Sequence, residues 1–395
     1  MNSPGTALFT HAGSDAPLAG LRVLDLSRVL AGPLCTMTLA DLGADVIKVE
    51  RPGSGDETRQ WGPPWAGKGE NRESAYYLCA NRNKRSVTAD LGAGTGRTLV
   101  LNLARGADVL VENFAPGTMD RWGIGYEDLA RENPGLVFCS ISGYGVDGPE
   151  AGRPGYDFAV QARSGWMAVT GEAEGPPMKA GVAVVDVLTG QNAVIGILAA
   201  LRERERSGSG QRVEIALFDS AVAGLVNVTQ AALVGSEPAR HGNAHPTIVP
   251  YQAFDTADGT LVIAVGNDAQ WRRFCAAIGS DSLAADARFE TNPLRVQNRA
   301  ELTRLLAATL KERSASDWLD RLESADVPCA PVRTIGEAIE DPVLRARNGV
   351  WTMPGPGGPV QTVASPIRLS RTPAELNRGA PALGEHQDEV SLHGW

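Results

Sequence analysis

The sequence predicts an α/β protein built on a parallel sheet with helices on both faces. Over the first two hundred residues, strand-like stretches alternate with helix-like stretches, and this βαβα order is typical of parallel sheets. From about Tyr251 the pattern changes to a hairpin followed by helices, which indicates a second, smaller α+β unit. At 395 residues the chain is long enough for two or three domain-sized units, or for one large domain with an insertion.

Each element is predicted from hydrophobic periodicity and from the turn residues that bound it. In the first part, the predicted strands are 21–26, 46–50, 108–112, 136–142 and 212–216, and the helices are 33–43, 96–105, 126–131, 186–204 and 218–234. The helix at 186–204 ends in Arg-Glu-Arg-Glu-Arg followed by Ser-Gly-Ser-Gly, which is a clear stop signal. In the second part, the hairpin 251–256 and 260–265 precedes helices 269–278, 300–312 and 316–324, a strand through 332, a helix at 335–339, and strand-like pieces near 350–352 and 367–369.

Composition excludes several classes of protein. The chain has 37 Lys and Arg against 46 Asp and Glu, a net charge of −9, so it offers no basic footprint for nucleic acid or an anionic membrane. Uninterrupted apolar runs such as 193–201 are shorter than the roughly 18–20 residues of a membrane span, and no export signal is apparent. Five scattered cysteines without a Cys-x-x-Cys pair predict neither disulfides nor a metal site, and indicate a cytoplasmic protein.

Several common catalytic motifs are missing. Gly92-Ala-Gly-Thr-Gly-Arg-Thr98 lacks the lysine of a phosphate loop and reads as a turn that opens a helix. The glycine fingerprint of NAD-binding domains does not follow the first strand, so NAD binding is not expected. There is no G-x-S-x-G motif, and no histidine occurs between residues 12 and 240, which argues against a Ser-His-Asp hydrolase.

Seven local strings remain: Ser27-Arg-Val-Leu-Ala-Gly-Pro33, Gly43-Ala-Asp-Val-Ile-Lys-Val-Glu-Arg-Pro52, Asn81-Arg-Asn-Lys-Arg85, Glu112-Asn-Phe-Ala-Pro-Gly117, Gly155-Tyr-Asp-Phe158, Gly171-Glu-Ala-Glu-Gly-Pro-Pro177 and Gly384-Glu-His-Gln-Asp-Glu389. Together they resemble the class III coenzyme A transferases, the family of formyl-CoA transferase and carnitine CoA-transferase, which also includes α-methylacyl-CoA racemases. The resemblance runs from about Leu18 to Val390. It implies a Rossmann-like large domain built from both chain ends, with a smaller α+β domain inserted (1–220, 221–327 and 328–395), in an interlocked homodimer.

The resemblance also implies a site for coenzyme A, with acyl-CoA and a small carboxylic acid as substrates and no permanently bound cofactor or metal. A CoA ligand carries phosphates and an adenine, so its site needs cations, helix N-termini and apolar walls. By the resemblance, the CoA site is lined by Arg28, Val29, Leu30, Ala31, Arg51, Asn113, Phe114 and Arg121. Lys84 and Arg85 are further candidate cations, although they could equally solvate the start of a strand.

A carboxylate can run acyl exchange as a covalent nucleophile, which suits a region without histidine. The family places an aspartate in a Gly-x-x-Asp-Gly-Pro-Pro loop, and here Glu174 takes its place. The extra methylene moves the carboxylate by more than about 1 Å, a distance to which reactive geometry is sensitive. Gly175 and two prolines would hold Glu174 on a stiff turn, and backbone amides after Glu174 and in the Gly242 loop would stabilise the oxyanions.

Asp157 is the competing carboxylate. In the racemases the matching aspartate works with a histidine from a preceding segment, and this chain has none there. Asp157 could also simply cap the helix that follows it. A CoA-transferase is therefore expected, with an α-methylacyl-CoA racemase and a non-catalytic CoA-binding paralogue as alternatives.

The segment Gly242-Asn-Ala-His-Pro246 matches a glycine-rich loop that closes over the nucleophile in formyl-CoA transferase, but it keeps only one glycine of that run. His245 could contact a substrate carboxylate or orient the loop. Leu30 replaces a glutamine that touches the small acid in formyl-CoA transferase, which indicates an acid larger or less polar than formate or oxalate. Succinate is a reasonable first donor acid by analogy alone.

Overall fold

The computed structural model describes residues 15–395, so the first fourteen residues of the predicted large domain lie outside the described residues. Two compact units divide the chain. The first unit comprises the described residues up to Trp166, then Ala180–Val234 and Pro342–Trp395; the second comprises Met167–Lys179 and Gly235–Asp341. The predicted domain ranges and the interlocked homodimer stay predictions.

The first unit is built on a parallel sheet, as predicted. Its strand order is β5-β2-β1-β6-β7-β8, and every neighbouring pair is parallel. The strands are β1 (Arg22–Asp25), β2 (Asp45–Glu50), β5 (Lys84–Thr88), β6 (Val109–Glu112), β7 (Val137–Ser142) and β8 (Arg212–Ala216). After β1 the chain builds the sheet outward in one direction through β2 and β5, and then crosses back to add β6 on the other side of β1. The ends of β1 and β6 therefore form a topological switch point.

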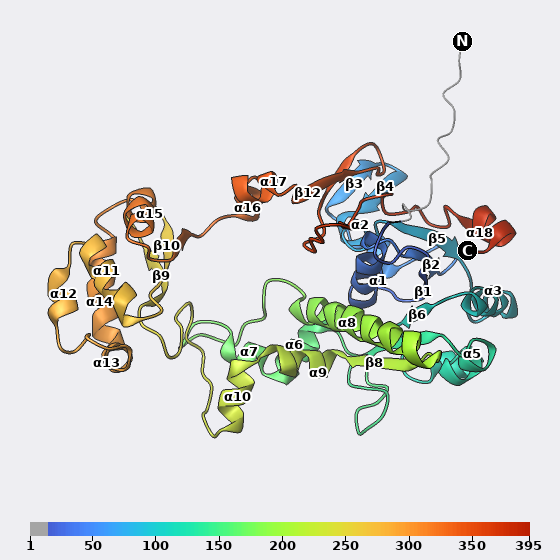
Figure 1. Cartoon of the computed structure of the whole chain (residues 1–395), viewed down its shortest axis with the longest axis horizontal. Helices are drawn as coiled ribbons and strands as arrows, with labels where there is room; N and C mark the ends of the chain where they lie inside the picture. The colour runs from blue at the N-terminus through green and yellow to red at the C-terminus, as the bar shows by residue number, and fades with distance from the viewer. Residues whose placement is uncertain (1–14) are drawn as a thin grey trace, which may run out of the picture. The chain divides into compact units, whose positions relative to one another are not determined.

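Helices cover both faces of this sheet because its strands are apolar on both sides. Val23 of β1 packs with α1 (Ala31–Asp41), α8 (Val184–Ser207) and α9 (Leu217–Gly224), and α1 and α8 lie side by side (Figure 1). Leu24 points to the opposite face, into the cluster formed by α3 (Gly94–Arg105), α5 (Tyr126–Glu132) and Val390 of α18 (Gln387–His393). Each sheet face thus closes its own hydrophobic core.

Helix α8 corrects one expectation from the sequence. Averaged over an 18-residue window, it is long and apolar enough to cross a membrane by length and composition, although no uninterrupted apolar run reaches that length. Val185, Ala193 and Ile197 of this helix are buried in the core with α1. Packing inside the first unit therefore accounts for much of its apolar character.

Two other predicted elements differ from the structure. The single helix predicted at 218–234 is two helices, α9 and α10 (Asn227–Leu233), because Val226 adopts a left-handed φ of 41° and turns the chain. The strand piece predicted near 367–369 is absent among the described residues. Strand β12 (Val350–Met353) pairs instead with β13 (Val360–Val363), since the Gly- and Pro-rich turn between them brings the adjacent segment back antiparallel.

The remaining elements of the first unit are short. They are the hairpin β3 (Trp65–Lys68) and β4 (Asn71–Ser74), the 3-10 turn η1 (Glu57–Gln60), and the helices α2 (Ala75–Leu78), α4 (Thr118–Arg121), α6 (Asp157–Ser164) and α17 (Pro342–Ala346). The second unit holds the antiparallel sheet β9 (Tyr251–Asp255), β10 (Thr260–Ala264) and β11 (Cys329–Pro331), with α11 (Asp268–Ala277), α12 (Asp281–Ala285), α13 (Asn292–Gln297), α14 (Arg299–Leu310), α15 (Ala315–Ser324) and α16 (Ile335–Ile339). Its core includes Trp271, Phe274 and Trp318.

Candidate active site

Two neighbouring cavities lie at the switch point of the sheet, where ligands bind in doubly wound folds. The first, of about 220 Å³, is lined by Arg28, Arg51 and Phe114 among others. The second, of about 350 Å³, is lined by the whole predicted loop Arg28–Ala31 together with Asn113 and Phe114. Arg28, Glu57 and Phe114 line both cavities, so the two are adjacent parts of one groove. The structure thus brings together most residues predicted for the CoA site.

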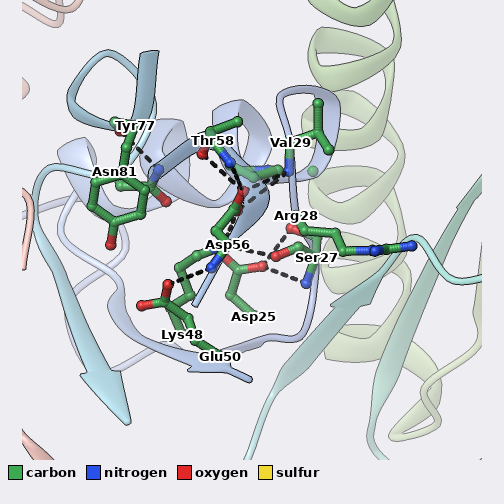
Figure 2. A network of polar contacts seen from close by, with 12 residues as sticks. Asp25, Ser27, Arg28, Val29, Lys48, Glu50, Asp56, Thr58, Tyr77 and Asn81 are labelled. Atoms are coloured by element: carbon green, nitrogen blue, oxygen red, sulfur yellow. Dashed lines mark hydrogen bonds and ion pairs between the residues drawn. The ribbon is translucent and has the colours of Figure 1, made fainter. Parts of the chain in front are cut away.

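The loop between β1 and α1 is strained. Val29 has a φ of 71°, a left-handed conformation that costs a β-branched residue about 1–3 kcal/mol. Hydrogen bonds hold the backbone on either side. The Asn113 side chain accepts from the Arg28 amide at 3.0 Å and donates to the Arg28 carbonyl at 2.7 Å. The Val29 amide donates to the carboxylate of Asp56 at 3.2 and 3.3 Å (Figure 2).

A buried ionic network of Asp25, Lys48 and Asp56 contacts the backbone of this loop and stabilises it. Asp25 accepts from the amide of Ser27 at 2.9 Å, and Lys48 Nζ donates to the Ser27 carbonyl at 2.7 Å while pairing with Asp56 at 3.0 Å. Burial alone would raise the pKa of Asp25, but Lys84 and Lys48 lower it to about 2. The pKa of Asp56 is also lowered, because Lys48 and the bonds from Thr58 outweigh burial. Both carboxylates are therefore ionised at neutral pH.

Lys84 and Arg85 do not reach the groove. Lys84 is fully buried, and its Nζ contacts Asp25 at 3.0 Å, the Pro33 carbonyl at 2.9 Å and Asn81 at 2.9 Å. Burial lowers the pKa of Lys84 to about 8, although Asp25 opposes this shift. Arg85 is buried and pairs with Asp45 at 2.6 Å and Glu389 at 3.1 Å. Both cations are paired with carboxylates of the protein itself, so the structure does not support the prediction that they bind CoA.

Arg121 is also outside both cavities. It ends α4, is exposed, and donates to Thr118 Oγ1 at 2.8 Å. The sequence reasoning missed Asp25, Lys48 and Asp56, which hold the loop. For Asp25 and Lys48 a signal was available, because charged residues that directly follow apolar pairs within predicted strands are expected to lie near a site or an ion pair. Asp56 lies in the loop after β2 and carried no such signal.

The sequence suggested that Asp157 caps the helix it begins, but in the structure it does not. Its Oδ2 accepts from the amides of Val185 at 2.8 Å and Asp186 at 3.3 Å, so it caps the N-terminus of α8 instead. Its Oδ1 accepts from Gln161 at 2.5 Å. The lining residues of the two cavities include no histidine, so the partner that the racemases use is not among them.

Asp186 is an ionisable group in the second cavity that the sequence analysis did not single out. Burial, and then the neighbouring charge of Asp157, raise its pKa from 3.8 to about 7. Between these values the folded protein keeps a proton that the unfolded chain has lost, so stability falls as pH rises through this window. Above pH 7, ionisation of Asp186 costs the folded state at most roughly 4 kcal/mol.

Asp186→Asn removes this cost, because asparagine has the same shape and does not ionise. We expect the melting temperature of the variant to exceed that of the wild type at pH 8, and the difference to disappear near pH 4. Thermal unfolding followed by circular dichroism at both pH values measures this. An equal difference at the two pH values would show that the effect comes from packing and not from titration.

Glu174 lies in the second unit, on an exposed turn. The loop that carries it is closed by the Met178 amide, which donates to the Thr170 carbonyl at 3.0 Å, and by the Gly175 amide, which donates to the Glu172 carbonyl at 3.0 Å. The Gly242 amide donates to the Gly171 carbonyl at 3.0 Å. The predicted nucleophile loop and the predicted covering loop are therefore in direct contact.

The backbone conformation at this contact favours glycine at position 242. Its φ is 56°, and a Cβ there would lie 2.7 Å from the Glu172 carboxylate. His245 has an imidazole Nδ1 that accepts from the Thr247 amide at 3.2 Å, and its backbone amide donates to the Tyr251 carbonyl at 2.9 Å. Burial, and then Arg299, lower the pKa of His245. These bonds favour an orienting role for His245 within the loop.

Most of the backbone amides expected to stabilise an oxyanion already donate hydrogen bonds to the protein itself. The Gly175 amide donates to the Glu172 carbonyl and the Gly242 amide to the Gly171 carbonyl. Pro176 and Pro177 have no N–H. In the described part of the Gly242 loop, the Asn243 amide donates to no protein acceptor. Asn243 is therefore the amide of this loop that is available to a ligand.

A sequence model of CoA-transferase family III matches residues 18–387. A protein of Agrobacterium fabrum named succinate–glutarate CoA-transferase is 46% identical over 378 residues, which cover 95% of this chain and 94% of the relative. The succinyl-CoA:glutarate CoA-transferase of Mus musculus is 42% identical over 376 residues, 95% of this chain and 85% of the relative. The crystal structure of a CAIB/BAIF family protein from Brucella suis has a TM-score of 0.88 at 44% identity, covering 96% of this chain and all (100%) of that chain.

Proposed function

Because the chain belongs to CoA-transferase family III and is an enzyme of that class, we propose that it transfers CoA from succinyl-CoA to a dicarboxylic acid of about the size of glutarate. The observation that carries the choice of acids is the similarity over 95% of the chain to two relatives named for succinate or succinyl-CoA and glutarate. Leu30, which lines the second cavity, supports an acceptor larger or less polar than oxalate.

In the proposed mechanism, Glu174 is the covalent nucleophile. Its carboxylate attacks the thioester carbonyl of the donor, which gives a mixed anhydride and CoA thiolate. The thiolate attacks the glutamyl carbonyl of the anhydride, so that an enzyme-glutamyl-CoA thioester forms and the donor acid leaves. The acceptor carboxylate attacks this thioester and regenerates an anhydride and thiolate. Attack of the thiolate on the acceptor acyl group then releases the new acyl-CoA and restores Glu174.

Each attack places negative charge on a carbonyl oxygen. Because the Gly175 amide already donates to the Glu172 carbonyl, we assign oxyanion stabilisation to the Asn243 amide of the adjoining loop. The CoA portion would lie in the groove at the switch point, with the loop Arg28–Ala31 and Phe114 as its walls. The reaction as written needs no metal or redox cofactor.

A panel of acids tests the proposal. With succinyl-CoA as donor, we expect kcat/KM for glutarate to exceed that for formate or oxalate by at least about tenfold, since even one methylene in a pocket is worth about 1–3 kcal/mol and glutarate has several that oxalate lacks. Product acyl-CoA is measured by liquid chromatography and mass spectrometry. Preference for oxalate would reject the assigned acceptor. CoA binding without product from any acid would reject the transferase and favour a non-catalytic CoA-binding protein.

A further inference from the structure

A third cavity, of about 600 Å³, lies in the first unit outside the groove. Its walls come from the loop after β2, from η1, from the β3–β4 hairpin, from Lys84 of β5, whose charge is paired with Asp25, and from the C-terminal segment, which supplies 354–356, 378–383, 385 and 386. It shares no lining residue with either cavity of the groove. The family function therefore leaves this cavity unexplained.

In this cavity the guanidinium of Arg378 faces the imidazole of His386, and both present a hydrogen-bond donor. The Ser86 amide donates to Nδ1 of His386 at 3.3 Å, while Arg378 Nη1 lies 3.4 Å from Nε2 of the same ring. Burial lowers the pKa of His386, so at neutral pH the ring is uncharged and carries a single proton. The Ser86 amide belongs to strand β5 and cannot turn away, so the proton is on Nε2. The guanidinium of Arg378 then faces an N–H, and an acceptor between the two groups would satisfy both.

The cations of this cavity differ in how fully they are paired. Arg59 is saturated by Glu50, Glu73, Tyr77 and the Pro381 carbonyl. In contrast, within residues 15–395 Arg378 has no side-chain contact with an acceptor other than His386. Arg72 stacks on the ring of Trp65 at 4.3 Å and pairs with no carboxylate of the described chain. Two guanidiniums and one imidazole N–H are thus available to a ligand.

We propose that this cavity binds a small oxyanion, a carboxylate or a phosphate, between Arg378 and Nε2–H of His386, with Arg72 as a further cationic contact. A guanidinium and an N–H donor that converge on one point match the geometry of an oxyanion and form charge-assisted bonds. The partly buried position of Arg378 and His386 strengthens these bonds relative to open water. The site is separate from the groove, so it can be occupied together with CoA.

Calorimetry with inorganic phosphate and with succinate tests the site, each titrated into full-length protein saturated with CoA. CoA fills the groove and excludes phosphate from it. Succinate bound at the transfer site is recognised because it does not depend on Arg378, which lines neither cavity of the groove. We expect one of the two anions to bind, and Arg378→Gln to weaken that binding at least about tenfold. His386→Asn, which keeps an acceptor for the Ser86 amide, should weaken it as well. The matched control Arg206→Gln changes an exposed arginine on α8 and should bind like the wild type.

The two anions distinguish the source of the ligand: preference for phosphate indicates a phosphorylated metabolite, and preference for succinate a free acid. Unchanged thermal unfolding of the variants without ligand, together with unchanged CoA affinity, separates loss of the site from loss of the fold. The proposal is overturned if neither anion binds the CoA-saturated protein, or if Arg378→Gln binds as tightly as Arg206→Gln. Transferase activity is measured separately, so failure of this site leaves the proposed function untouched.

Discussion

Replacement of Glu174 by glutamine should lower kcat for CoA transfer by more than about a thousandfold. The amide cannot form the anhydride, and removal of a covalent nucleophile costs several orders of magnitude in rate. The exposed turn that carries Glu174 is closed by backbone hydrogen bonds, so the substitution leaves the loop intact. Steady-state transfer from succinyl-CoA to glutarate measures the loss, and CoA affinity should remain within about twofold.

Glu172→Gln is the matched control, because Glu172 is an exposed glutamate of the same loop. It should retain most activity. Incubation with succinyl-CoA, trapping with hydroxylamine and peptide mass spectrometry should place the modification on the peptide of Glu174, at that residue. Trapping on Asp157 would move the nucleophile to the first unit, where that side chain already accepts three hydrogen bonds. Activity lost in Glu172→Gln and kept in Glu174→Gln would assign the role to Glu172.

The parallel sheet was predicted from local signals along the chain, whereas the residues of the groove were predicted from the family resemblance. Strands alternate with helices along the chain, and the residues that follow β1 and β6 must meet wherever those strands are neighbours. Arg28–Ala31 and Asn113 therefore come together as expected. The contact between the Glu174 and Gly242 loops has no such local signal, and only the family resemblance placed them together.

Burial and long-range hydrogen bonding could not be predicted in the same way. Lys84 and Arg85 look like exposed cations at the start of a strand, but their partners Asp25, Asp45 and Glu389 are 59, 40 and 304 residues away in sequence. Asp157 has the position of a cap for its own helix, yet it caps one that begins 27 residues later, at Val184. Such choices depend on tertiary packing, which is not encoded in the spacing of nearby residues.

Asn113 supports the strained loop between β1 and α1. Asn113→Ala removes both hydrogen bonds that hold the backbone of Arg28, so Val29 can relax from its left-handed φ of 71° and the loop loses the shape that lines the groove. We expect the KM for acyl-CoA to rise by about ten- to a hundredfold, which corresponds to the roughly 1–3 kcal/mol of strain, with little change in kcat.

Val29→Gly should restore part of this loss in the Asn113→Ala background, because glycine adopts a positive φ without steric cost and needs less support from its neighbours. Val29→Ala is the matched control: it also shortens the side chain, but its Cβ retains the penalty, so it should not restore binding. The KM values of the single and double variants form a thermodynamic cycle. If the effects of Asn113→Ala and Val29→Gly simply add, Asn113 acts by direct contact with CoA. Rescue by glycine and not by alanine would establish that Asn113 works through the conformation of Val29.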